Sequence, residues 1–259
     1  MLRYFPFDHD GYDMPMNAKA GVGALIELDE SEYLHELALK ETILASDYRY
    51  YFQCPDENID LAWDCIRLLL PDMAAHYPEQ FKLHCDGDLW RWTNNLKKSE
   101  QVFSFGDCST LPYHPLDWVG REVQEDLIVM AEIDGGDTIC VGGQLCFPAG
   151  WCLDDKVSEN FLRIHEDVPQ FLERIGRPAD LMMRRLKPGR PTGRLNWTIV
   201  TINKLDLPPK TSHDWVTSRR GITAENAGDR CFLRVERQTF SRLPTTRGVL
   251  SLYIPILIR

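Results

Sequence analysis

The sequence lacks the signals by which several large classes of protein are recognised. No apolar run in its 259 residues approaches the roughly 18 residues that a membrane-spanning helix needs. The aromatic and acidic start of the chain has no basic segment followed by an apolar one, so we expect no secretory signal peptide. The formal net charge of −10 leaves no basic footprint, so we expect binding to neither nucleic acid nor a membrane.

Motifs for nucleotides and metal clusters are also missing. No GxGxxG segment opens a helix after a strand, and neither a P-loop nor a GxSxG motif occurs. None of the eight cysteines forms a CxxC pair, so we expect neither a zinc ribbon nor an iron–sulfur cluster. Without a signal peptide, these cysteines are expected to be reduced thiols in a cytoplasmic protein.

The apolar periodicity predicts an α+β protein. Asp29–Ser46 and Asn58–Tyr77 have helical spacing, and Pro71 is expected to break or kink the second helix. Phe81–Thr93 predicts two short extended pieces joined by a turn at residues 86–88, and Leu96–Pro115 is expected to be a loop. Five β-rich runs follow: Glu122–Ala131, Thr138–Phe147, Arg194–Asn203, Cys231–Phe240 and Val249–Ile258.

This order is compatible with a five-stranded antiparallel sheet that has helices on one face, an order that PAS domains share. Residues 133–137 supply hairpin chemistry between the first two strands, and Pro255 suggests an edge position or a bulge in the last. We expect residues 1–58 to form an arm and a helix that pack on the core. Residues 59–259 then form the main domain, in what is one continuous structural unit.

The stretch from Trp151 to Trp197 is the most informative. Val157, Phe161 and His165 are four residues apart, so a helix would place all three on one face. An imidazole on such a face has two interpretations. It is either a structural histidine held by a backbone carbonyl or an axial ligand of haem. A thiolate ligand from Cys146 or Cys152, which flank the segment FPAGW, is a further alternative.

Charged residues interrupt three apolar or loop segments. In VQEDL (residues 123–127), strand alternation puts Glu125 and Asp126 on opposite faces. The first interpretation is that one face of the strand is solvated. The second is that one of the two carboxylates pairs with an arginine or faces a cationic substrate. In LRVERQT (residues 233–239), Arg237 shares its face with apolar neighbours, whereas Glu236 lies on the other. Arg237 would either form an internal salt bridge with Glu125 or Asp126, or act at a ligand.

A basic loop, RRLKPGRPTGR (residues 184–194), lies in this acidic chain. It contains Arg190 and Arg194, and arginine forks are suited to carboxylates. The loop is either a solvated basic patch or a site for anionic groups, such as haem propionates or the acidic face of a partner.

Five of these segments resemble, in content and order, one family: VQEDL, CFPAGW, IHEDVP, LKPGRPTGRLNW and RVERQTFSRLP. The family is that of the haem-binding α subunit of haem-dependent oxidative N-demethylase, a dimethylamine monooxygenase. The resemblance extends over about Ala20 to Arg247. It departs at Gly193, where a bulkier residue is common, and at the apolar last strand, LSLYIPILIR.

The resemblance implies a PAS-like fold that carries haem b. It implies O₂-dependent removal of an N-methyl group from a small secondary amine, with electrons supplied through separate flavin and iron–sulfur subunits. It favours His165 as the iron ligand, with Arg190 and Arg194 for the propionates. Glu236, Arg237, Glu125 and Asp126 become candidates for the oxygen-binding or amine-binding groups, and Trp151, Trp197 and Tyr113 candidates for the pocket walls.

Two rival functions stay open at this point. One is a haem–PAS sensor of gas or redox state without turnover, although no signalling helix follows the last strand. The other is a binding protein without haem, in which His165 is structural.

Overall fold

A computed structural model describes residues 16–133 and 137–258 of the chain. Its main feature is a sheet with strand order β1-β8-β9-β10-β6-β7-β2, in which all neighbours are antiparallel. The strands are β1 (Lys19–Ala20), β2 (Phe52–Gln53), β6 (Asp126–Glu132), β7 (Thr138–Gln144), β8 (Thr192–Val200), β9 (Phe232–Arg242) and β10 (Val249–Ile258).

The expectation of five strands was wrong by two, while the α+β class and the antiparallel sheet are confirmed. The additional strands, β1 and β2, have two residues each and pair with β8 and β7 at the two ends of the sheet. A two-residue strand has no periodicity that a sequence can show. Both strands come from residues 16–58, which also supply helix α1 (Tyr33–Ser46) and the buried Leu25 and Ile26.

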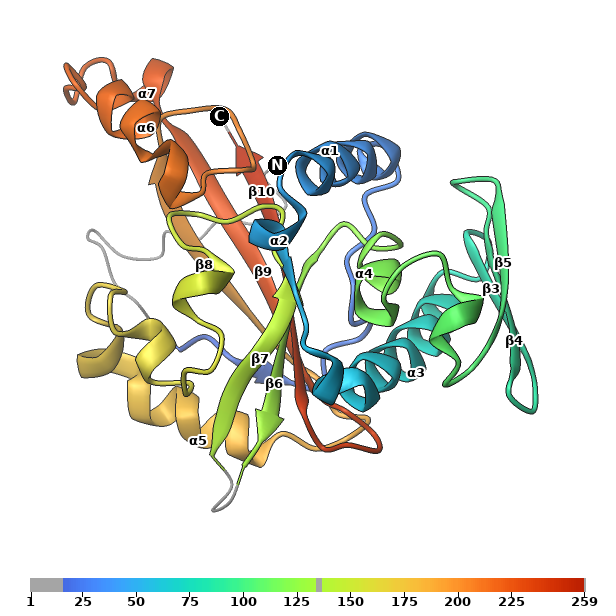
Figure 1. Ribbon diagram of the computed structural model, residues 1–259. Coiled ribbons are helices and arrows are strands. Elements are labelled where there is room, and N and C mark those ends of the chain that lie inside the picture. Colours follow the sequence, from blue (N-terminus) through green and yellow to red (C-terminus); the bar gives the residue numbers. More distant parts are fainter. Residues whose placement is uncertain (1–15, 134–136, 259) are drawn as a thin grey trace.

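Helices and turns cover both faces of the large sheet, not one face as expected (Figure 1). The helices are α1, α2 (Tyr48–Tyr51), α3 (Ile59–His76), α4 (Pro115–Gly120), α5 (Arg177–Arg185), α6 (Ser212–Ser218) and α7 (Ala227–Arg230). Strand alternation separates two cores. Leu127 and Val129 face a first core beneath α1, α3 and α4, and Ile128 and Met130 face a second core beneath residues 151–186.

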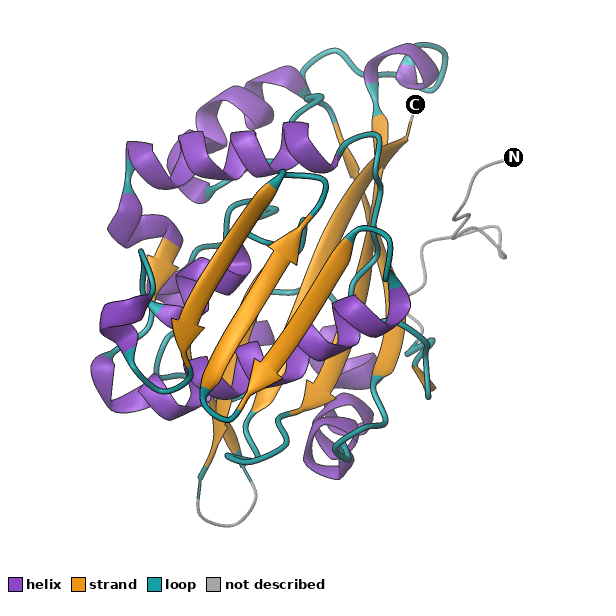
Figure 2. Cartoon of the chain, turned by 90° about the vertical axis from the view of Figure 1, so that its right-hand side faces the viewer, coloured by secondary structure: helices purple, strands orange, loops and turns teal. Residues whose placement is uncertain are grey.

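A second, three-stranded sheet packs its buried aromatic side chains into the first core (Figure 2). It consists of β3 (Phe81–Asp86), β4 (Leu89–Asn94) and β5 (Ser99–Ser104). The turn between β3 and β4 was expected, whereas β5 falls in a segment expected to be a loop. Only one of its side chains, Phe103, is buried, so the strand carries little apolar alternation.

The two prolines expected to interrupt elements behave differently. Helix α3 continues through Pro71 to His76, because its buried residues hold it against the first core. In β10, pairing with β6 ends at Tyr253, whereas pairing with β9 continues to Ile258. Among the described residues, Pro255 therefore has a strand neighbour on one side alone, as its missing N–H requires.

Candidate functional site

The chain between β7 and α5 forms the cover of the second core. The helix expected through Val157, Phe161 and His165 does not form. Instead, Ser158 N–H donates to Cys140 O (2.7 Å) and Phe161 N–H to Thr138 O (3.2 Å), so this backbone follows the free part of β7. A single 3-10 turn, Arg163–His165, comes next. Long-range backbone pairing with β7 thus replaces the local helical hydrogen bonds that the spacing predicted.

His165 is held in one orientation. Its Nδ1 lies 2.8 Å from Phe161 O, and since a carbonyl only accepts, Nδ1 carries the proton. Its ring stacks on Phe171, with centroids 4.3 Å apart and planes inclined by 13°, and is tilted against Phe161 at 4.7 Å. Nε2 is left with a lone pair and has no hydrogen-bond partner among the residues that the structure describes.

The surroundings keep this imidazole neutral. The pKa of His165 is lowered to about 4, mainly by burial and in smaller part by the positive charges of Lys156 and Arg194. The hydrogen bond from Nδ1 to Phe161 O acts in the opposite direction. A neutral imidazole with one nitrogen held by a carbonyl and the other free is the form that ligates a metal.

None of the other described histidines combines a buried ring with an Nε2 that carries a lone pair. His35, His76, His84 and His213 are exposed. His114 caps α4, where its Nδ1 accepts from Leu116 N–H (3.2 Å), so its Nε2 carries the proton. In the described part of the chain, no group of three or more His, Cys, Asp or Glu side chains could hold a metal ion. A metal here would need a cofactor to complete its coordination.

The thiol alternative fits the structure less well. Cys146 belongs to the first core, on the opposite side of the sheet from His165. The Cys152 Sγ donates to Asp155 Oδ2 (3.1 Å). Burial raises the pKa of both thiols, whereas a metal ligand must be a thiolate.

A polar row crosses the sheet on the His165 side. Strand register places Arg194 opposite Gln238, Gln238 opposite Tyr253, and Tyr253 opposite Asp126. Glu236 lies on the same face, two residues from Gln238, with its carboxylate 3.3 Å from both Arg234 Nε and Gln238 Nε2. Two of the sequence candidates, Arg194 and Glu236, thus share one face with His165.

Asp126 is also a candidate, and both oxygens of its carboxylate already accept hydrogen bonds from the backbone. Its two carboxylate oxygens accept from Cys146 N–H (2.7 Å) and Phe147 N–H (2.8 Å). Burial raises the pKa of Asp126 to about 7, and Lys40 opposes this shift. These contacts tie the start of β6 to the segment that follows β7.

Three candidates lie on the other face of the sheet. Arg237 donates to Leu25 O (3.0 Å) and Ala24 O (2.8 Å) and pairs with Glu27 (3.4 Å), in place of the expected pairing with Glu125 or Asp126. Glu125 accepts from Glu27 N–H at 2.7 Å. Strand alternation puts Trp197, which is opposite Val235 in the register, on the Arg237 side.

The remaining three candidates lie in different parts of the fold. Trp151 packs against the second core, which also contains Phe161 and Phe171. Arg190 is exposed in the turn that follows α5, where its N–H donates to Lys187 O (3.2 Å). Tyr113 lies beyond the first core, with its ring 4.1 Å beneath the Arg121 guanidinium.

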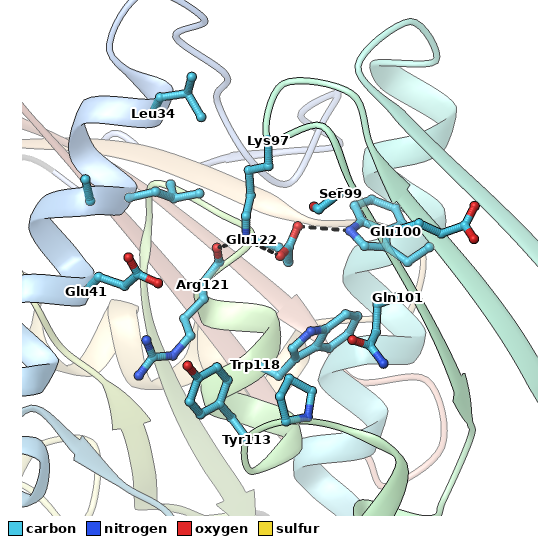
Figure 3. Close-up of a pocket in the computed structure, with 14 residues that line it drawn as sticks. Leu34, Glu41, Lys97, Ser99, Glu100, Gln101, Tyr113, Trp118, Arg121 and Glu122 are labelled. Atoms are coloured by element: carbon cyan, nitrogen blue, oxygen red, sulfur yellow. Dashed lines mark hydrogen bonds and ion pairs between the residues drawn. The ribbon is translucent and has the colours of Figure 1, made fainter.

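Tyr113 and Arg121 line a cavity of about 330 Å³ between α1, α4 and the small sheet (Figure 3). Arg121 is paired with Asp117 (2.9 Å), and Lys97 with Glu122 (2.6 Å). Glu122 also accepts from Trp92 Nε1 and Asn94 Nδ2. Because these charges already satisfy one another, we place the candidate site at His165 and not here.

Two notable residues were missed from the sequence. Tyr253 lies in the polar row, and the pattern Val249, Ser251, Tyr253 on one face of an apolar strand was the available signal. Lys40 is completely buried and donates to Gly120 O, Val123 O and Glu125 O at 2.6, 3.1 and 2.7 Å. Lys40 comes three residues after the buried Leu37 and four before the buried Leu44, so its place on the apolar face of α1 was the available signal.

No helix in the described ranges is long and apolar enough to cross a bilayer. The resemblance noted in five segments extends over nearly the whole chain. A family model described as haem-dependent oxidative N-demethylase, alpha subunit-like, matches residues 17–252, and the chain belongs to this family.

Proposed function

We propose that this chain is the haem-bearing subunit of an oxidative N-demethylase, with His165 as the axial ligand of haem b. One observation carries the proposal: the imidazole is fixed through Nδ1, stacked on Phe171, and presents a neutral Nε2. A carbonyl that accepts from the second ring nitrogen is the usual support of a metal-ligating histidine.

The surroundings suit a flat, apolar cofactor with acidic side chains. The second core supplies apolar side chains, among them Ile128, Met130 and Phe240. Arg194 supplies a guanidinium on the same face, and such a group binds carboxylates in a forked geometry. We propose that Arg194, with Arg190 at the end of the loop, binds the propionates, and that Trp151 contributes to the apolar wall.

When bound, haem supplies the iron at which O₂ is reduced. The overall reaction for dimethylamine would be (CH₃)₂NH + O₂ + 2e⁻ + 2H⁺ → CH₃NH₂ + CH₂O + H₂O. The electrons must come from elsewhere, since the sequence has no flavin or iron–sulfur motif. We propose separate flavin and iron–sulfur reductase subunits, in keeping with the alpha-subunit description of the family.

Glu236 is the carboxylate that we assign to the amine. Its partners Arg234 and Gln238 are both at 3.3 Å, so its acceptor capacity is only partly used. A protonated amine binds well to a carboxylate that accepts its N–H groups. Asp126, Glu125, Arg237 and Trp197 would support the site through the sheet, because their present contacts fix the strands and the segments beside them.

The absorption spectrum of the haem-reconstituted protein tests this assignment, as isolated and after dithionite and CO. We expect a Soret band of a histidine-ligated haem that is lost or shifted in H165A and unchanged in H213A, a substitution at an exposed histidine. Formaldehyde release from dimethylamine with a chemical reductant then separates an enzyme from a sensor.

Two results would contradict the proposal. A protein that stays colourless after reconstitution would exclude a haem function altogether. An unchanged band in H165A would move the ligand to another residue.

A further inference from the structure

We propose that Tyr253 and Glu236 together form the binding site of the substrate ammonium, and that the Tyr253 ring selects N-methylated amines. This inference rests on the proposed function and adds a specificity residue to it. Among the described residues, Tyr253 is the one tyrosine that a strand presents on the His165 face of the large sheet.

The register brings the two side chains together. β9 and β10 are neighbours at the centre of the sheet (Figure 1), with Tyr253 opposite Gln238 and Pro255 opposite Glu236. Glu236 and Tyr253 are therefore diagonal neighbours on one face, a separation that an aromatic side chain spans. The Glu236 carboxylate raises the pKa of Tyr253, which also indicates that the two groups lie close.

The phenol is held in place and stays protonated. Its ring makes an edge-to-face contact with Phe240, with centroids 6.3 Å apart. Burial is the largest cause that raises the pKa of Tyr253, and the Ser251 hydroxyl and Arg194 oppose it. The ring is thus a fixed neutral surface beside a carboxylate, on the side of the sheet that faces His165.

A carboxylate and an aromatic ring recognise different parts of a methylated ammonium. The carboxylate accepts from the charged N–H groups, which methylammonium and dimethylammonium both carry. The electron-rich ring face attracts a cation whose charge is spread over N-methyl groups, as in the aromatic cages that bind methylated ammonium ions. Together they favour an amine that has both N–H and N-methyl groups, which is a secondary methylamine.

Arg194 limits where the ammonium can sit. Its guanidinium lies on β8, opposite Gln238, and repels another cation. The carboxylate and the phenol lie on β9 and β10, further along the sheet. Arg234 pairs with Glu236 at 3.3 Å and also donates to Leu205 O and Phe147 O, so the ammonium would share this carboxylate with one guanidinium that is already hydrogen-bonded elsewhere. Arg194 marks the part of the face that suits acidic groups of a cofactor, and Glu236 with Tyr253 marks the part that suits an amine.

Binding of methylammonium and dimethylammonium to the haem-reconstituted protein tests the inference by calorimetry, without turnover. We expect Y253L to weaken dimethylammonium binding by about 2- to 30-fold and to move the ratio of the two dissociation constants towards one. E236Q should weaken both amines by a similar factor and keep the ratio. Y113L, which removes a tyrosine that packs on Arg121 across the sheet, is the matched control.

A second measurement covers the case in which Y253L does not fold. In protein that is protonated only on its tyrosine rings and held as the ferrous CO complex, saturation of the ring protons should transfer to the methyl protons of dimethylammonium. We expect this transfer in wild type and Y113F and its loss in the nearly isosteric Y253F.

The inference fails if Y253L keeps the wild-type ratio, or if transfer persists in Y253F. Either result would leave the Soret band and the role of His165 intact. A missing Soret band in wild type would instead refute the proposed function.

Discussion

The rings of His165 and Phe171 lie face to face, with centroids 4.3 Å apart and planes inclined by 13°. Phe171 precedes the π-helical turn Leu172–Gly176, and its N–H donates to Val168 O. The residue that orients the imidazole face therefore comes from a different turn than Phe161, which holds the Nδ1 edge. Two separate contacts fix one side chain.

Replacing Phe171 by leucine should loosen this arrangement. We expect the pKa of His165 to rise from about 4 towards the ordinary value of 6.5, because water gains access to the exposed ring face. The titration of the imidazole C–H resonances in the haem-free protein measures it. F105L, at a partly buried phenylalanine on the far side of the first core, should leave the titration unchanged, and an equal pKa in both variants would contradict the expectation.

Burial of Glu125 and Asp126 predicts that the protein loses stability as the pH rises towards 8. Both folded pKa values are raised to about 7, so the folded state binds more protons than the unfolded state between about pH 4 and 7. Stability from this source is fully present below the unfolded pKa and is lost as the pH rises through 7.

E125Q should remove part of that loss, because glutamine keeps an acceptor for Glu27 N–H and cannot ionise. The melting temperature of wild type, E125Q and the exposed control E41Q, measured between pH 5 and 8, checks this. E125Q is expected to flatten the profile, and a profile that runs parallel to wild type would refute the assignment.

Removal of the Lys40 ammonium should strongly destabilise the fold. K40M leaves the carbonyls of Gly120, Val123 and Glu125 without their donor in the protein interior. We expect a loss of about 3 to 5 kcal/mol, because each buried acceptor left without a donor costs about 1 to 3 kcal/mol. The midpoint of urea denaturation measures it against K82M, at an exposed lysine of β3, and a loss below about 1 kcal/mol would contradict the structural role.

Lys210 should hold the segment between β8 and β9, residues 204–230, against α2. Its ammonium lies 3.8 Å from the Tyr50 ring centroid, 4.5 Å from that of Tyr51, and 3.0 Å from Asp47 Oδ2. Since these contacts join the segment to α2, K210A is expected to accelerate limited proteolysis within residues 204–230 several-fold. K204A removes an exposed lysine from the same segment. Equal cleavage rates in the two variants would show that the contacts of Lys210 do not hold the segment in place.

The sequence alone determined the class of the protein and much of its local structure. Helical spacing located α1 and α3, and β10 has the predicted bounds, because these elements are long and their apolar periodicity is strong. Alternation in LRVERQT separated Glu236 from Arg237, as the register confirms. The five ordered segments identified the family, which needs side-chain identity and no geometry.

Only the tertiary structure decided which candidates lie together. Backbone pairing with β7 replaced the helix expected around His165, and residues 96–104 gained a strand that the sequence had not indicated. Arg237 and Glu125 were separated from His165 by the sheet itself, whereas Tyr253, a residue with no sequence motif, was brought beside Glu236. The contact between Tyr253 and Glu236 depends on the register of the β9–β10 hairpin, and the separation of the other two from His165 depends on which face of the sheet residues 151–186 cover. Alternation within a single strand fixes neither of these.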